Sequence, residues 1–157
     1  MATNSRREDA LLDLRSRVAF IEIAKGYGSD AGKAIFMGET PTFGPDDPPA
    51  ALAIVVGADS PTTQGGLVRT RVPVEIQAIV PATIDDAFMA LEAIVADIKR
   101  AVEIEGVQAF RTRSLKGTLP MGLERGVTRI LPRDEGSLFV GTGIEYVLSF
   151  EEKWGDP

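Results

Sequence analysis

The chain has 157 residues, of which 44% are hydrophobic, and it carries a formal net charge of −6. This length is enough for one hydrophobic core, so we expect a single domain spanning residues 1–157. Cysteine and histidine are both absent, which excludes disulfides, thiolate zinc sites, and catalytic or metal sites built on imidazole. We expect no membrane partner, because no apolar run approaches the roughly 20 residues that span a bilayer. The polar first residues do not fit a signal peptide, so we expect synthesis in a cytosol.

The first predicted helix begins after Asn4 or Ser5, either of which can cap it. Glu8 and Asp9 follow in its first turn, where acids suit the positive end of the helix dipole. Apolar residues then recur at helical spacing and predict one buried stripe: Leu11, Leu14, Val18 and Ile21. The glycines that follow predict the end of this helix near Lys25.

Residues 26–66 are rich in glycine and proline and contain two short apolar runs. Residues 34–37 predict a short strand, and 51–56 predict a second strand that is covered on both faces. A long exposed loop is predicted at about 38–50 because four prolines lie within it, and residues 60–66 predict a turn.

The strongest pattern is a strand that runs directly into a helix between residues 67 and 103. Every second position of the strand suits a buried face: Val68, Thr70, Val72, Val74, Ile76, Ala78 and Val80. Pro81 ends the strand, and Thr83 with Asp86 three residues later predicts the helix N-cap. Apolar residues form one stripe along this helix: Phe88, Leu91, Ile94, Val95, Ile98 and Val102. Asp97 lies mostly on the opposite, polar side of the helix.

Residues 106–133 form a basic stretch inside an acidic protein. The stretch has one acid, Glu124, and six basic residues, which are Arg111, Arg113, Lys116, Arg125, Arg129 and Arg133. Its charge is therefore +5, which leaves −11 on the rest of a chain whose net charge is −6. Short strands are predicted at 107–113 and 127–131, with a long loop at about 114–126 between them.

This long loop is the first candidate interaction region. Five of the six basic residues around it are arginine, which is preferred at protein interfaces and phosphate contacts. Apolar residues such as Leu119 and Met121 lie among them and favour burial against a partner. The alternative interpretation is a solvated basic face. We expect the loop Leu115 to Gly126 to be mobile in the monomer and to order on contact with a partner.

A second strong strand is predicted near the C-terminus, where Ile144, Tyr146, Leu148 and Phe150 alternate with more polar residues. We expect it to pair antiparallel with the strand that begins near residue 67, which makes the fold class α+β. Trp154 follows it, either as a cap over the edge of the core or as an anchor at a subunit contact.

Paired carboxylates are the main candidates for chemistry, and they occur at Asp46 with Asp47, Asp85 with Asp86, and Glu151 with Glu152. Each pair has a structural interpretation, respectively in a proline-rich loop, at a helix N-terminus and at a solvated strand end. No further ligands accompany them, so we expect no catalytic residues, no metal and no cofactor.

The order of these elements resembles the tail terminator (tail completion, minor tail) proteins of long-tailed bacteriophages. The resemblance covers nearly the full length. It rests on a charged helix start, glycine-rich and proline-rich loops around short strands, and a strand that leads through Pro81 and Thr83 into one long amphipathic helix. A long polar loop follows, and the final strand closes on Glu151, Glu152 and Lys153.

The resemblance implies a structural virion protein and not an enzyme. Its fold would be a mainly antiparallel sheet with the long helix and the N-terminal helix packed on one side. It would form a homohexameric ring that ends tail tube polymerisation and docks the head connector. Its partners would be other copies, the tail tube protein and the connector or stopper protein, with DNA only in transit. It would be assembled in the bacterial host cytoplasm and end in the neck region of the virion tail.

A ring made by one chain needs heterologous contacts, in which two different patches meet. The basic residues 111–133 provide one such patch, and the acidic strand end with Glu145, Glu151 and Glu152 provides the other. A second hypothesis assigns the arginines to DNA passing through the ring. The alternative from another class is a small ligand-binding domain or carboxylate-based enzyme, with its pocket between the sheet and the long loop.

Overall fold

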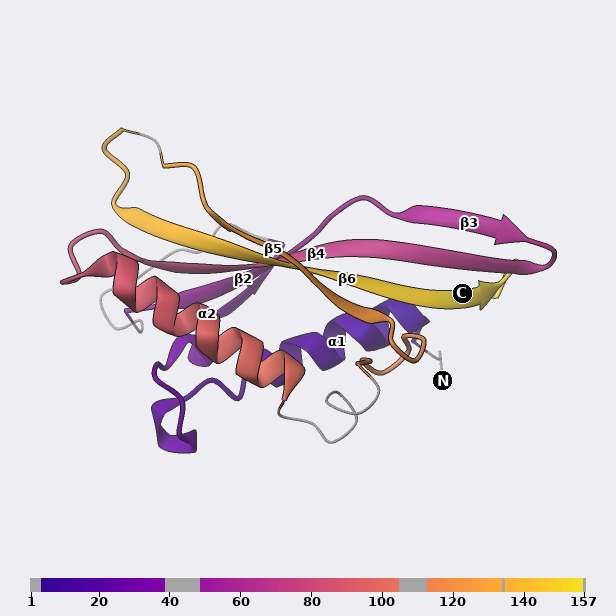
Figure 1. Cartoon of the computed structure of the whole chain (residues 1–157), viewed down its shortest axis with the longest axis horizontal. Coiled ribbons are helices and arrows are strands. Elements are labelled where there is room, and N and C mark those ends of the chain that lie inside the picture. The colour runs from indigo at the N-terminus through magenta and orange to yellow at the C-terminus, as the bar shows by residue number, and fades with distance from the viewer. Residues whose placement is uncertain (1–3, 39–48, 105–112, 134, 157) are drawn as a thin grey trace.

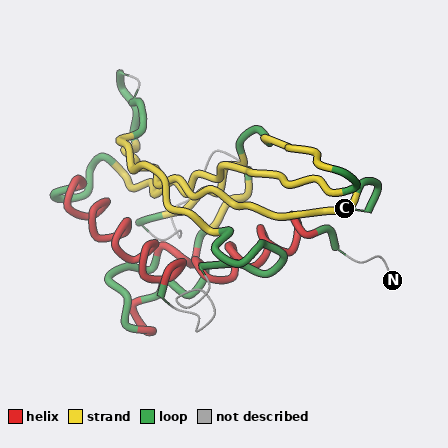
Figure 2. Tube along the Cα trace, turned by 45° about the vertical axis from the view of Figure 1, so that its right-hand side comes forward, coloured by secondary structure: helices red, strands yellow, loops and turns green. Residues whose placement is uncertain are grey.

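The strand and helix predicted between residues 67 and 103 form the centre of the structure. They are β4 (Leu67–Pro81) and α2 (Ala87–Glu103), and β4 buries every second residue from Thr70 to Val80. The structure is a computed structural model, and it describes residues 4–38, 49–104, 113–133 and 135–156. Both helices cover the same face of one sheet, so the chain is a two-layer α+β domain as predicted (Figures 1 and 2).

The sheet has six strands in the order β1-β2-β4-β6-β5. The sixth strand, β3, pairs with residues 67–71 of β4, which β2 does not reach. The remaining strands are β1 (Ile35–Met37), β2 (Ala51–Val56), β3 (Ser60–Gln64), β5 (Leu123–Ile130) and β6 (Phe139–Lys153). β1 and β2 pair in parallel, and all the other pairs are antiparallel. The predicted antiparallel pairing of the two strongest strands is confirmed, because β4 and β6 pair from Leu67 with Lys153 to Pro81 with Phe139.

The N-terminal helix α1 (Arg6–Val18) starts as predicted and ends early. Ser5 Oγ accepts a hydrogen bond from Glu8 N, and Ser5 N donates to Glu8 Oε2, which completes a capping box. The predicted end near Lys25 is wrong, because the helix stops at Val18. Gly32 packs against the last carbonyls, where a Cβ on it would lie 2.5 Å from Val18 O, and Ile21 enters the core from a turn. Two short 3-10 helices follow, Ile23–Lys25 and Ala31–Lys33.

The predicted start and stripe of α2 need three corrections. Asp86 is the N-cap in place of Thr83, since the chain first makes a turn after Pro81, and Asp86 Oδ1 accepts from Met89 N. Phe88 is 60% exposed and lies outside the core, because the first turn of α2 extends past the sheet. Asp97 is buried instead of solvated, because it accepts hydrogen bonds from Gly28 N and Ser29 Oγ, 3.1 and 3.0 Å away.

Two predicted loops contain strands. Residues 60–64 form β3 and only Gly65 and Gly66 make the turn, because Thr62 and Thr63 continue the ladder opposite Arg69 and Val68. β5 starts at Leu123, so the predicted strand at 127–131 begins four residues earlier. The predicted strand at 107–113 and most of the predicted loop at 38–50 fall outside the described residues.

Candidate functional site

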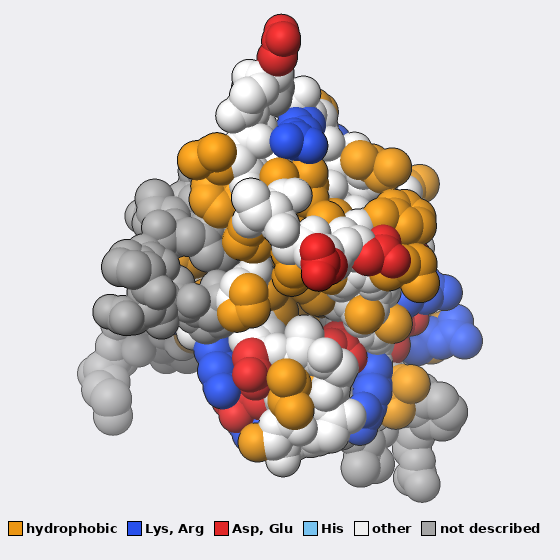
Figure 3. Space-filling model, turned by 90° about the vertical axis from the view of Figure 1, so that its left-hand side faces the viewer, with side chains coloured by type: hydrophobic (Ala, Val, Ile, Leu, Met, Phe, Trp, Pro, Cys, Tyr) orange, Lys and Arg blue, Asp and Glu red, His pale blue; other side chains and the backbone are white. Residues whose placement is uncertain are grey.

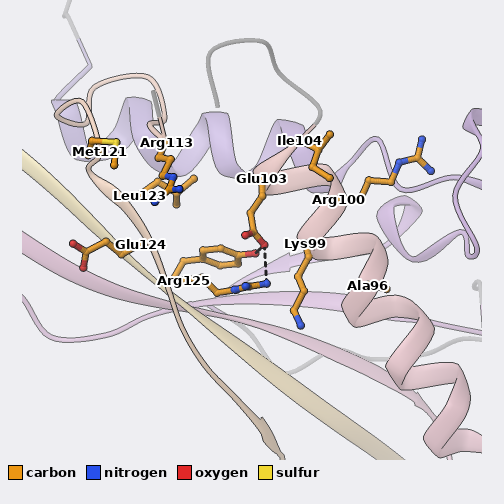
Figure 4. Close-up of a pocket in the computed structure, with 11 residues that line it drawn as sticks. Ala96, Lys99, Arg100, Glu103, Ile104, Arg113, Met121, Leu123, Glu124 and Arg125 are labelled. Carbon is orange, nitrogen blue, oxygen red and sulfur yellow. Dashed lines mark hydrogen bonds and ion pairs between the residues drawn. The ribbon is translucent and has the colours of Figure 1, made fainter. Parts of the chain in front are cut away.

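A cleft of about 1030 Å³ opens between the C-terminal half of α2, the segment 113–122 and β5 (Figure 4). α2 contributes Lys99 and Glu103 to one side of the cleft, and Ile104 follows at its C-cap. Met121 and Arg125 line the other side. The cleft therefore lies between the sheet and the loop in which the sequence predicted interaction residues, at the place expected for a ligand pocket under the alternative hypothesis.

Glu103 organises the interior of this cleft. Its Oε2 accepts a hydrogen bond from the Tyr146 hydroxyl at 2.9 Å and lies 3.5 Å from Arg125 Nη1 (Figure 4). Burial, and then the neighbouring carboxylate of Glu103, raise the pKa of the Tyr146 phenol far above its ordinary value of 10.0. Tyr146 therefore stays protonated at neutral pH and serves as the donor to Glu103.

Two cationic side chains of the cleft have no ion pair within the described part of the chain, Lys99 and Arg113. Arg100, by contrast, donates to Gly26 O at 2.8 Å and stacks on the ring of Tyr27. The side chain of Met121, 55% exposed, supplies an apolar surface beside them. The cleft is therefore suited to a ligand that is partly apolar and partly acidic.

The segment 113–122 is hydrogen-bonded to other parts of the same chain. Leu119 N donates to Ser149 O, and Ser149 N donates to Gly122 O, so the segment extends the sheet beside β6. Leu115 is 4% exposed. Arg17 of α1 donates to Val102 O and Ser114 O at 2.9 and 3.0 Å, which fastens the segment to both helices.

The sheet face away from the helices carries ion pairs that connect three strands. Arg129 of β5 pairs with Glu75 of β4 at 2.7 Å, crossing β6 where Gly143 leaves the space open. Burial of Glu75 opposes ionisation, but hydrogen bonds from Arg129 and Gln77 hold the pKa of its carboxyl below the ordinary 4.5. Further pairs on this face join Arg71 with Glu124 and Arg69 with Glu151.

One residue of each charged patch inferred from the sequence lies close to the other patch on this face, Arg129 of the basic patch and Glu145 of the acidic patch. Glu145 is close enough to Arg129 to raise the pKa of that guanidinium further, after the direct effect of Glu75. Because Arg125 and Arg129 are partly neutralised inside the chain, the described residues 113–133 do not form one free basic surface.

The remaining predicted site residues are spread over the molecule. Lys116 lies 3.5 Å from Asp9 of α1, Arg133 donates to Ser137 O, and Leu119 is half-buried. Glu152 lies opposite Val68 at the end of β6, and the side chain of Trp154 is 74% exposed, so it does not cap the core. Arg111 lies outside the described residues.

Sequence reasoning missed Lys99, Glu103 and Tyr146 as site residues. The first two occupy the polar side of a helix, and Tyr146 occupies the apolar register of a strand. A tyrosine in that register offers one usable signal, because a buried hydroxyl needs a hydrogen-bond partner. The partner itself is 43 residues away in the sequence and cannot be found from spacing.

A second exposed apolar surface lies at the end of the molecule where α2 begins, and we name it the end face (Figure 3). Its exposed side chains are Phe88, Met89 and Leu138, of which Leu138 is 72% exposed. Ala82 N, in the turn before α2, donates a hydrogen bond to Leu138 O. This bond places Leu138 beside the start of α2.

Within the described ranges, Asp and Glu residues form no group of three that could hold a metal ion, and no helix there is long and apolar enough to cross a membrane. No model of a known protein family matches the chain, and a search of curated proteins finds no match either.

Proposed function

We propose that this chain is a structural protein of a long-tailed bacteriophage that forms a ring on the tail tube, ends tube polymerisation and docks the head connector. The order of elements along the sequence resembles the tail terminator family, and the α+β fold agrees with that resemblance. A role in assembly is supported by the exposed apolar side chains of the cleft, such as Met121, and of the end face, such as Phe88.

The observation that carries the proposal is a projecting ribbon of strands, which we name the arm. It comprises residues 60–70 and 150–156 from β3, β4 and the end of β6, and its outer part extends past the N-terminal end of α1 (Figure 1). All five residues of β3 are exposed, and Leu67 is 42% exposed. A strand ribbon that projects beyond its own core is suited to contact a neighbouring subunit.

The end face provides a second surface, at the opposite end of the sheet from the arm. A closed ring uses two different patches for its subunit contacts and still has to meet the tube and the connector. A chain with an exposed arm and an exposed apolar end face has surfaces for both kinds of contact.

Binding of DNA by the open sheet face receives less support from the charges. The basic residues in the register of this face, Arg69, Arg71, Arg129 and Lys153, are matched in number by acids: Glu75, Glu124, Glu145 and Glu151. A surface that holds DNA needs a basic excess. Retention of DNA that falls steeply between low and moderate salt would favour this second role.

A small-ligand domain is the other candidate, and the cleft with Lys99 and Arg113 is the observation that favours it. Its ligand would be a small organic anion. Calorimetric titration with a series of carboxylates and phosphates tests this role, and saturable binding that requires both cations would support it.

The proposed function is tested by removing the gene from the phage or prophage that carries it and imaging the particles. We expect tails of uncontrolled length, or tails that do not join heads. Normal infectious particles would contradict the proposal.

A further inference from the structure

The tip of the arm presents a tryptophan on a fixed turn, which we name the hook (residues 152–156). Asp156 N donates to Lys153 O at 2.9 Å, and Gly155 adopts a φ of 81° that closes this turn. Trp154 N donates to Gly66 O at 2.8 Å and ties the hook to the β3–β4 turn. The backbone is thus fixed while the indole remains 74% exposed.

A large aromatic side chain on a fixed backbone loses little conformational freedom when it is buried by a partner. Tryptophan is accordingly enriched among residues that dominate binding energy. The hook also carries Glu152 and Asp156, neither of which has an ion pair within the described part of the chain, beside the single basic residue Lys153. Its chemistry is an indole with acidic neighbours.

The cleft between α2 and β5 has the complementary chemistry. Ile104 and Met121 are 59% and 55% exposed and supply the apolar part. Lys99 and Arg113 supply two cations without ion pairs in the described ranges, and a cation over an indole face is attracted to it. Arg113 and Met121 also hold φ angles of 45° and 61°, a left-handed conformation that costs energy for such residues and often marks binding sites.

We propose that the hook of one copy enters the cleft of the next copy. Trp154 then packs between Ile104 and Met121, while Glu152 and Asp156 face Lys99 and Arg113. The bond to Gly66 keeps the hook at the tip of the arm, so a chain cannot fill its own cleft. Because hook and cleft are different patches, the contact can repeat head to tail, as the heterologous contacts of a ring require. This inference rests on the proposed function and names the contact between its subunits.

Cysteine cross-linking tests this contact cleanly, because the chain has no cysteine of its own. The first partner is the full chain with Ala96→Cys in the cleft wall, and the second is the full chain with Lys153→Cys in the hook. Neither substitution removes a group assigned to the contact. The two are mixed with a short bismaleimide, and a mass tag on one of them identifies heterodimers.

The matched control replaces Lys153→Cys with Leu138→Cys, a site that is 72% exposed and lies on the end face. We expect at least about tenfold more heterodimer from the hook mixture than from the control, and a loss of that excess when Trp154→Ala is added to the hook partner. Equal yields from the two mixtures, or an excess that survives Trp154→Ala, would overturn the inference.

The outcomes also separate this inference from the proposed function. If the chain forms rings or tails keep their normal length while the cross-link does not form, the hook contact is overturned and the function stands. The cross-link in a chain whose removal leaves phage tails normal would overturn the function and leave the contact standing.

Discussion

The Tyr146 hydroxyl donates to Glu103 at 2.9 Å, and this bond joins the middle of the sheet to the last turn of α2. Tyr146 is fully buried, so its hydroxyl depends on that carboxylate for a partner. The bond also fixes Glu103 beside Arg125, at the centre of the cleft. The stability of the core and the shape of the cleft are therefore linked through one pair of side chains.

Replacing Tyr146 with phenylalanine should lower the free energy of unfolding by about 1–3 kcal/mol, since Glu103 loses a buried donor. Urea denaturation at pH 7 measures the change. Phenylalanine at the exposed position 154 (Trp154→Phe) serves as a control and should leave the unfolding free energy nearly unchanged. Equal stability of Tyr146→Phe and the unchanged chain would contradict the role of this bond.

Stability should also depend on Tyr146 at alkaline pH. The pKa of its phenol is raised in the folded state, so the unfolded chain releases that proton first as the pH rises above 10.0. The folded state is thereby destabilised with increasing pH, and Tyr146→Phe should show a shallower loss of stability between about pH 9.5 and 11. Parallel curves for the two proteins in this range would count against the assignment.

At acidic pH the stability of the fold should depend on Glu75. Its pKa is lowered in the folded state, so the contribution of its ion pair with Arg129 is present above pH 4.5 and is lost as the pH falls below that value. Glu75→Gln should weaken the acid dependence of the unfolding free energy, measured by denaturation at pH 3 to 6. Glu151→Gln, which removes an exposed ion pair within the arm, should change this dependence less. The reverse order would contradict this account.

The Glu75–Arg129 ion pair should require glycine at position 143, because the pair crosses β6 at that residue. A Cβ on residue 143 would lie 2.6 Å from Glu75 Cδ, so Gly143→Ala should destabilise the fold by about 1–3 kcal/mol. A double-mutant cycle checks the cause, because the cost should shrink when Glu75→Ala removes the clashing side chain. An unchanged cost in the Glu75→Ala background would place the strain elsewhere.

Arg17 should control the segment 113–122 without forming part of the cleft wall. Arg17→Lys retains the charge but loses the forked contacts to Val102 O and Ser114 O. Amide exchange at residues 115–119 should accelerate by about tenfold or more, since each lost hydrogen bond is worth roughly 1 kcal/mol. Arg15→Lys on the exposed side of α1 is the matched control. Unchanged exchange in Arg17→Lys would show that other contacts hold the segment.

The parts of the fold that the sequence predicted are those in which one face of an element is buried. The alternation in β4 and β6 and the stripe from Leu91 to Val102 identify those elements, because burial selects apolar residues at a fixed period. The sequence did not predict β3, because this strand has no buried face. All its residues are exposed, so no apolar pattern marks the strand, and it is held by pairing with β4.

The candidate site was only partly predictable. A C-terminal tryptophan and a cluster of arginines are visible in the sequence, but the exposure of the tryptophan and the internal partners of the arginines are not. Arg129 pairs with Glu75, 54 residues away, and only the strand register shows that Gly143 lets the two meet. Buried Asp97 was misassigned for a related reason, since its partners at Gly28 and Ser29 come from a distant loop.

Electron microscopy of purified tails that carry a gold-labelled copy of this chain tests whether the chain forms a ring at one end of a phage tail. We expect label at the head-proximal end of each tail only, with a ring visible there. Label distributed along the tube, or tails without label, would contradict it.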